Sequence, residues 1–406
     1  MLLFYLFIYL CNFAVLQYVV VDYLWYRRKV PGANATAHGF DVIDEWGRVI
    51  PDPVRWPSSK GGVGFTEVAN KVHSMGLKFG IHVMRGISWQ AYDANTPILD
   101  TKTGGRFTAG GKEWHAQDIG IKERSCGWMQ QGFMSVNANL EAGRAFLRSL
   151  YEQYAQWGVD FIKNDCVFGD DLDKDQITFV SEVLQSLQRP ILYSLSPGTS
   201  ATPAMAKDVA RLTNMYRVTG DDWDTWGDVA AHFDVARDFA AANMIGAQGL
   251  RGKSWPDLDM LPLGWLTDPA SNEGPHRPSK LTLDEQKTQM WELNNDGALV
   301  SNYSGLCAVV NRAEANFVPN GLRAWRATGR NGETYIAFFN LNSAQTTISA
   351  NVADMVKTLP VSSGMHLSTS CKYREVWSGR EGFSNETIPS MTVPVHGCAL
   401  FVMNCA

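Results

Sequence analysis

The sequence lacks the features that mark several common protein classes. Its 406 residues carry 41 acidic and 36 basic side chains, so a net charge of −5 argues against a surface for nucleic acid. The seven cysteines include no CxxC pair, which argues against a zinc ribbon or a dithiol redox motif. No internal repeat or low-complexity stretch stands out. With 45% hydrophobic and 19% charged residues, intrinsic disorder is excluded. The length suits one large domain and a smaller one.

Aromatic residues are plentiful, with 14 Trp, 13 Tyr and 19 Phe. Core packing accounts for most of them, and sugar binding is another use for such rings. Three N-glycosylation sequons begin at Asn34, Asn302 and Asn385. Together with the possibility of cysteine pairs, they favour a glycoprotein of the secretory pathway. We therefore expect an extracellular, cell-wall or vacuole-lysosome location.

The first 21 residues are apolar except for Asn12 and Gln17. A signal-peptide core, a membrane span and a displaced start codon are three interpretations of this stretch. It lacks a positively charged start and a clear cleavage site, and it continues into residues 18–22, whose pattern is that of a buried parallel strand. We assign residues 1–16 to an apolar N-terminal segment and expect no membrane association.

Buried strands alternate with amphipathic helices after this segment. Helices are predicted at 66–75, 140–157, 177–187, 202–211 and 228–243, and strands at 77–82, 159–163, 190–193 and 215–217. Repeated βα units predict a parallel sheet. Short β-like runs follow at 322–327, 334–340, 346–350, 375–377, 391–395 and 399–402. We predict a (β/α) barrel over residues 17–315 and an antiparallel β domain over residues 316–406. The Gly-rich stretch from 83 to 140 is predicted to be an active-site loop.

In a βα barrel the active site lies at the carboxyl ends of the strands. The residues predicted there are Asp22, His82, Asp165, Arg217 with Asp221, and Asp257 with Asp259. Several carboxylates at one barrel mouth suit glycoside hydrolysis, which uses one as nucleophile or base and another as acid. A metal-dependent lyase would need clustered histidines, and the eight histidines are scattered. We therefore expect no metal and no cofactor.

One acidic cluster imitates a calcium loop. Asp171, Asp173 and Asp175, followed by Glu182, have the spacing of an EF-hand, but Gln176 stands where that loop needs glycine. The same residues open a predicted helix, whose dipole favours acidic side chains at its start. We interpret the cluster as a helix start.

Five motifs in order resemble glycoside hydrolase family 27, the α-galactosidases or melibiases. They are Lys163-Asn-Asp165, Arg217-Val-Thr-Gly-Asp221, Trp255-Pro-Asp257-Leu-Asp259-Met-Leu, the strand at 77–81, and Val21-Asp22-Tyr23-Leu24-Trp25. The resemblance covers roughly residues 17–295. It implies a (β/α)8 TIM-type barrel followed by a C-terminal antiparallel β-sandwich.

The resemblance also implies a retaining mechanism, with Asp165 as nucleophile and Asp221 as acid/base. Lys163, two residues before Asp165 on a strand, points to the same face and keeps that carboxyl ionised. A neighbouring carboxylate, Asp222 or Asp259, would raise the proton affinity of Asp221, whereas Arg217 would lower it. The implied sugar-binding residues are Asp22, Tyr23, Trp25, His82, Lys163, Ser196, Arg217, Asp257 and Asp259. A disulfide between Cys126 and Cys166 is implied beside the nucleophile. The partners of Cys371, Cys398 and Cys405 stay unassigned.

The chain departs from the family pattern at both ends of the barrel. The family's G-W-N-S-W strand is missing before Asp22, and the run after Met290 does not follow the family's last strand. The sequence thus predicts an incomplete barrel that lacks its first strand, with exposed apolar surface. The alternative to an enzyme is a catalytically impaired remnant that still binds sugar.

Tyr23 and Ser196 stand where the family has two acidic sugar contacts. β-L-Arabinopyranose has the ring stereochemistry of α-D-galactopyranose without C6, and Tyr23 would fill the space of the missing hydroxymethyl group. We therefore expect a carbohydrate substrate ending in galactose or arabinopyranose, with some preference for the latter. The other interpretation is that Tyr23 drifted without functional consequence.

Overall fold

The structure is a computed structural model. It describes residues 2–3, 17–221 and 226–258, and then 265–266, 277–278, 291–293, 299–301, 314–317, 321–328, 333–351, 371–384 and 387–405. Contacts divide the chain into two compact units. The barrel unit comprises Met1–Tyr5, Leu16–Trp223 and Gly246–Pro278, and the C-terminal unit comprises Leu6–Val15, Asp224–Ile245 and Ser279–Ala406. The predicted N-terminal segment 1–16 lies outside the described residues, except for residues 2–3.

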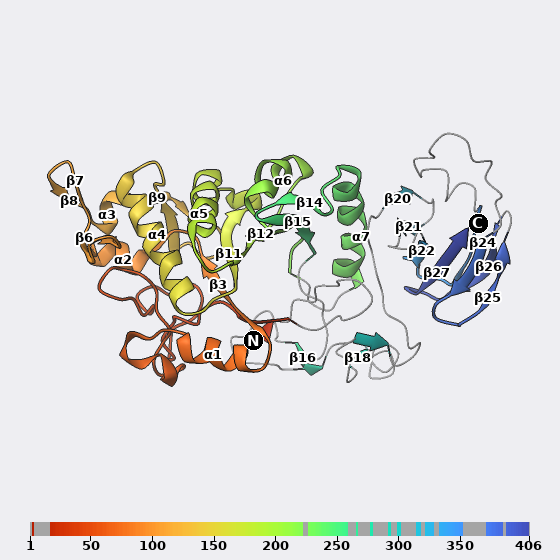
Figure 1. Ribbon diagram of the computed structural model, residues 1–406, viewed down its shortest axis with the longest axis horizontal. Helices are drawn as coiled ribbons and strands as arrows, with labels where there is room; N and C mark the ends of the chain where they lie inside the picture. The colour runs from red at the N-terminus through yellow and green to blue at the C-terminus, as the bar shows by residue number, and fades with distance from the viewer. Residues whose placement is uncertain are drawn as a thin grey trace. The chain divides into compact units, whose positions relative to one another are not determined.

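The barrel unit is built on one sheet with the strand order β1-β2-β3-β11-β12-β13-β15-β14. Figure 1 labels β3, β11, β12, β14 and β15 of this sheet. The strands are β1 Leu2–Leu3, β2 Tyr18–Val21, β3 Lys78–Met84, β11 Phe161–Phe168, β12 Leu192–Pro197, β13 Met215–Arg217, β14 Ala247–Gly249 and β15 Gly252–Asp257. From β2 to β15 all neighbours are parallel, and β1 and β14 are antiparallel at the two edges. From β2 to β15 the parallel strands also lie side by side in the order in which they follow along the chain, as the strands of a (β/α)8 barrel do.

Helices connect these strands. They are α1 Thr66–Ser74, α4 Glu141–Gln156, α5 Lys174–Ser186 and α6 Pro203–Val209, with 3-10 turns η1 Pro57–Gly62, η2 Gly169–Asp171 and η3 Ala210–Leu212. Thr202 caps α6, since its Oγ1 accepts the Met205 N–H at 3.3 Å, and a proline follows at the first helical position. The apolar stripe of α4 is buried as predicted, including Phe146, Leu150 and Tyr154.

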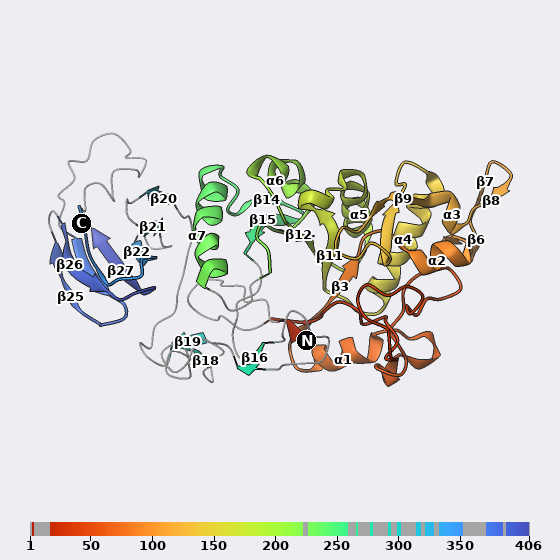
Figure 2. The ribbon, with the colours of Figure 1, turned by 180° about the vertical axis from the view of Figure 1, so that it is seen from behind.

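The stretch between β3 and α4 is not the plain loop that the sequence predicts. It contains β4 Ile87–Ser88, α2 Trp89–Ala94, β5 Leu99–Asp100, β6 Gly105–Arg106, β7 Thr108–Ala109, β8 Lys112–Glu113, α3 Ala116–Ile119, β9 Gly120–Ser125 and β10 Phe133–Val136. Strands β4, β10 and β9 form a small antiparallel sheet. Figure 2 shows these elements together at the end of the barrel unit, beside α4. We call this stretch the insert.

The C-terminal unit begins with α7 Trp226–Ala241 and continues as antiparallel strands. They are β20 Glu314–Phe317, β21 Leu322–Thr328, β22 Thr334–Asn340, β23 Thr346–Asn351, β24 Cys371–Glu375, β25 Glu381–Ser384, β26 Thr387–Val393 and β27 Cys398–Cys405. Six form a sheet in the order β20-β21-β22-β27-β24-β25, and β23 pairs with β26. Ile336, Phe338, Ile348 and Phe401 lie in the core. The two-stranded pairs β16 Trp265–Leu266 with β17 Arg277–Pro278, and β18 Trp291–Leu293 with β19 Leu299–Ser301, lie between the two folds in sequence.

Two local features of this unit differ from the sequence prediction. Of the predicted run 375–377, Glu375 ends β24 and residues 376–378 form a turn, in which the Glu375 carboxylate accepts the N–H groups of Trp377 and Ser378. Helix α7, predicted as part of the barrel domain, groups with the β strands, where Arg323 pairs with Asp234 at 2.8 Å.

Cys371 is disulfide-bonded and Cys398 is a free thiol. Across the described residues, none of the helices has the length and apolar character to span a bilayer.

Candidate active site

The carboxyl ends of the parallel strands carry the predicted site residues. Asp22 follows β2, His82 lies near the end of β3, Asp165 on β11, Ser196 on β12, and Arg217 and Asp257 end β13 and β15. The register sets His82 opposite Lys163, and Arg217 opposite Asp257. Because these strands are neighbours in one sheet, side chains up to 235 residues apart in sequence, Asp22 and Asp257, lie at one edge. Asp259 lies outside the described residues.

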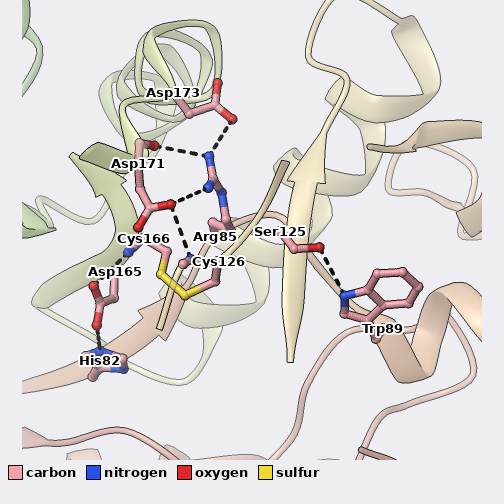
Figure 3. Close-up of a disulfide and its surroundings, with 10 residues drawn as sticks. His82, Arg85, Trp89, Ser125, Cys126, Asp165, Cys166, Asp171 and Asp173 are labelled. Atoms are coloured by element: carbon pink, nitrogen blue, oxygen red, sulfur yellow. Dashed lines mark hydrogen bonds and ion pairs between the residues drawn. A yellow bond between two sulfur atoms is a disulfide. The ribbon is translucent and has the colours of Figure 1, made fainter. Parts of the chain in front are cut away.

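Asp165 is buried, with 6% of its surface exposed, and both carboxylate oxygens are held. The His82 Nε2 atom lies 2.9 Å from Oδ2, and the Cys166 N–H donates to Oδ1 at 2.7 Å (Figure 3). Burial alone would raise the pKa of Asp165. The hydrogen bond and charge of His82, the charge of Lys163 and the Cys166 N–H outweigh burial and lower this pKa to about 2. Asp165 is therefore a carboxylate at neutral pH, which is the form that a nucleophile needs.

Asp221 has a different environment. Its side chain is 50% exposed, and the buried Arg217 donates from Nη2 to Asp221 Oδ1 at 2.5 Å. The neighbours expected to raise the proton affinity of Asp221, Asp222 and Asp259, lie outside the described residues. Asp165 is thus buried and held in place, whereas Asp221 faces solvent, where a leaving group or a water molecule can reach it.

Tyr23 lies among the charged residues of the mouth. Its ring packs edge-on against His82, with centroids 6.2 Å apart. Burial raises the pKa of the Tyr23 hydroxyl, and the negative charges of Asp22 and Asp221 raise it further. The hydroxyl therefore stays protonated and available as a hydrogen-bond donor. Asp22 accepts the Tyr23 N–H at 2.8 Å, which fixes the start of this segment.

Trp25 does not have the position expected of a sugar contact. The side chain is completely buried and packs edge-on against Tyr26, Phe65 and Trp157. Its Nε1–H donates to the backbone oxygen of His82 at 2.6 Å. Trp25 therefore belongs to the core, and it supports the strand that carries His82. The sequence motif could not distinguish a ring that faces the substrate from one beneath the site.

Two buried polar atoms at the mouth lack a hydrogen-bond partner within the part of the chain that the structure describes. They are Ser196 Oγ and His82 Nδ1. The residues belong to β12 and β3, the two strands that flank β11 and its Asp165. Buried polar atoms are rarely left unpaired in native proteins, and a sugar hydroxyl is a suitable partner for either.

A disulfide joins β11, the strand that carries Asp165, to the insert, as the resemblance implies. Cys126 and Cys166 are bonded, with Cα atoms 5.4 Å apart (Figure 3). Two residues beyond Cys126, Trp128 is 40% exposed, and its ring packs edge-on against Tyr23 at 5.9 Å. Sequence reasoning missed Trp128. Its spacing from a cysteine implied to lie beside the nucleophile was the available signal.

The acidic cluster that imitates a calcium loop has a structural role. Arg85, directly after β3, pairs with Asp171 at 3.3 Å and with Asp173 at 3.4 Å (Figure 3). Asp173 also caps α5 by accepting the Gln176 N–H, and Asp171 accepts the N–H of Gly127 beside the disulfide. These contacts hold the insert against the segment between β11 and α5. In the described part of the chain, no three His, Cys, Asp or Glu side chains are arranged to hold a metal ion.

A parallel sheet with carboxylates at its carboxyl edge is the arrangement expected of a barrel glycoside hydrolase. The α-galactosidase C-terminal β-sandwich domain family matches residues 319–403. The structure is similar to a family 27 β-L-arabinopyranosidase from Geobacillus stearothermophilus, with a TM-score of 0.75 and 29% identity over 96% of this chain and 88% of that one.

Two further similar proteins are also glycosidases by name. A putative α-N-acetylgalactosaminidase from Bacillus halodurans has a TM-score of 0.69 and 28% identity, covering 96% of this chain and 89% of that one. In sequence, an α-galactosidase of Oryza sativa is 22% identical over 404 residues, which are 95% of this chain and 75% of that one. The C-terminal domain match, the α-galactosidase relatives and the family 27 structure together support a member of glycoside hydrolase family 27, the family of the α-galactosidases.

Proposed function

We propose that the protein is a retaining glycosidase that releases terminal β-L-arabinopyranosyl or α-D-galactosyl residues, with a preference for the former. The observation that carries this proposal is the state of Asp165. A buried carboxylate with both oxygens held and a pKa lowered to about 2 is suited to attack an anomeric carbon at neutral pH. The similarity to family 27 supports the reaction class, and the different environments of Asp165 and Asp221 support the division of roles.

In the first step, Asp165 attacks the anomeric carbon, and the bond from that carbon to the leaving oxygen breaks. Protonated Asp221 gives its proton to the leaving oxygen, so that an alcohol departs and a glycosyl ester of Asp165 remains. In the second step, Asp221 takes a proton from water, whose oxygen attacks the same carbon and releases Asp165. Two inversions return the original anomeric configuration. Arg217 orients Asp221 for both transfers.

The choice of sugar follows from Tyr23. The half-buried ring lies between His82 and Trp128, and interacts electrostatically with Asp22 and Asp221. A phenol at this place leaves less room for a hydroxymethyl group than a carboxylate does, and it offers no carboxylate acceptor for the C6 hydroxyl. The similar Geobacillus structure is a β-L-arabinopyranosidase, and a variant of that enzyme was solved with arabinose. Both observations support arabinopyranosides as the preferred substrates.

Kinetics on two nitrophenyl substrates test the proposal. The β-L-arabinopyranoside should have the higher kcat/KM, the α-D-galactoside a lower one, and Asp165→Asn should reduce turnover of both by about a thousand-fold or more. Circular dichroism of the Asn variant checks that it is folded. Near-normal turnover by folded Asp165→Asn would remove this residue from the nucleophile's role. Sugar binding without turnover by the parent protein would indicate the impaired remnant instead.

We also propose entry into the secretory pathway. The Cys126–Cys166 disulfide and an exposed Asn34 in its sequon support this location. Expression in a eukaryotic host should give a protein whose gel mobility changes on endoglycosidase treatment, and Asn34→Gln should reduce that change. An identical shift for the parent and the Asn34→Gln variant would show that Asn34 is not modified.

A further inference from the structure

A hollow of about 620 Å³ opens in the insert, apart from the carboxylates at the strand ends. Its wall includes the ring of Trp89, the exposed side chains of Asp93, Glu123, Gln130 and Gln131, and the loop around Gly127. The volume lies within the range of small-ligand sites. All of these residues belong to the barrel unit.

The Trp89 ring is held in place at the edge of this hollow. Its Nε1–H donates to Ser125 Oγ at 3.3 Å, as Figure 3 shows, and the Lys122 ammonium lies 5.6 Å from the ring centroid. Trp89 also starts α2, whose cap is the buried Ser88, so the backbone beneath the ring is fixed as well. A fixed indole can bind a ligand with little further loss of side-chain entropy.

The hollow is connected to the active site through the disulfide. Ser125 in its wall precedes Cys126, which is bonded to Cys166, and Cys166 follows the nucleophile Asp165. With the two half-cystine Cα atoms 5.4 Å apart, the Cα atoms of Ser125 and Asp165 are at most about 13 Å apart. From the same loop, Trp128 reaches Tyr23, whereas Gly127 and Gln130 line the hollow.

The chemistry of the wall suits a neutral sugar. An indole packs against the C–H face of a pyranose, and carboxylate and amide groups pair with its hydroxyls. Asp93 and Glu123 disfavour an anionic ligand, and the His38 ring nitrogen at the rim lies 3.1 Å from Asp93. We propose that the hollow is a distal subsite, which binds a sugar of the oligosaccharide on the leaving-group side of the scissile bond. This proposal rests on the proposed function.

Substrate length provides the test. Trp89→Ala and Gln130→Ala should leave kcat/KM on nitrophenyl β-L-arabinopyranoside and α-D-galactoside unchanged. On tri- and tetrasaccharides with the same terminal sugar, both variants should lower kcat/KM by about ten-fold. Trp114→Ala is the matched control, because this tryptophan belongs to the same insert but not to the wall of the hollow. It should behave as the parent on every substrate.

A loss confined to the longer substrates supports the subsite. Equal losses on nitrophenyl and oligosaccharide substrates, or no loss on either, would overturn it. If the parent turns over no glycoside, the proposed function fails, and calorimetric binding of the tetrasaccharides to the parent and Trp89→Ala proteins still tests the hollow. Binding that disappears in Trp89→Ala supports the subsite, and equal or absent binding in both contradicts it.

Discussion

The contact between His82 and Asp165 leads to a prediction about how activity and stability depend on pH. The His82→Phe substitution removes the hydrogen bond to Asp165 Oδ2 and the imidazole charge, while it keeps an aromatic ring for Tyr23 to pack against. Burial of Asp165 remains and now has fewer opposing interactions. The pKa of Asp165 should therefore rise from about 2 to the ordinary value of about 4 or above.

The sign of the stability effect follows from the direction of this shift. In the parent protein the folded-state pKa lies below the unfolded value, so the ionised carboxyl stabilises the fold above pH 4 or so, and this stabilisation is lost as pH falls through about 2. A difference of two pKa units corresponds to roughly 2.7 kcal/mol. At pH 7, His82→Phe should therefore lower the free energy of unfolding by up to about that amount, before any packing change.

The assay is kcat/KM on nitrophenyl β-L-arabinopyranoside between pH 3 and 7, with denaturant unfolding at pH 7 and pH 4. In His82→Phe the acid limb should move upward by at least one pH unit, and His82→Gln, which retains a donor, should lie between it and the parent. His73→Phe is the control, because His73 pairs with Asp160 at 2.7 Å outside the site. An acid limb for His82→Phe that coincides with those of the parent and the control would refute the electrostatic role of His82.

Three further predictions concern other residues. Tyr23→Asp should raise the galactoside to arabinopyranoside ratio of kcat/KM by about ten-fold, and an unchanged ratio would contradict the role of Tyr23. Asp221→Asn should slow alkyl glycosides far more than nitrophenyl glycosides, because only the poor leaving group needs a proton; equal losses in the two rates would exclude Asp221 as the acid. Cys126→Ser opens a bond across 40 residues and should lower the free energy of unfolding by about 4 kcal/mol in denaturant titration. Replacing the free thiol Cys398 with Ser is its control, and a similar loss in both variants would show that the effect is not one of the crosslink.

Much of the barrel could be predicted from local patterns. The stripe of Phe146, Leu150 and Tyr154 is periodic, and a buried apolar strand follows it, so both elements appear in the structure where the sequence indicates them. The insert could not be predicted in this way. Its strands β4, β9 and β10 are two to six residues long, and they depend on pairing between distant segments more than on their own composition.

From the sequence, the site could be predicted as a set of residues at strand ends, but the contacts among these residues could not. Motif order places Asp165 and Arg217 with Asp221 at one edge, whereas the contact of His82 with Asp165 depends on the register of β3 and β11. For Trp25 the motif predicted a sugar contact, and this prediction is wrong. A motif position gives the residue type, and only packing decides that this indole lies in the core.

Covalent trapping is the measurement that tests the central claim most directly. A fluorosugar inactivator of β-L-arabinopyranosyl configuration forms its glycosyl-enzyme faster than the ester is hydrolysed, so the protein should gain the mass of one sugar. Peptide mapping should place this mass on Asp165, and the Asp165→Asn protein should gain none. Label on a different carboxylate, or turnover without label and with inverted anomeric configuration of the released sugar, would contradict the account.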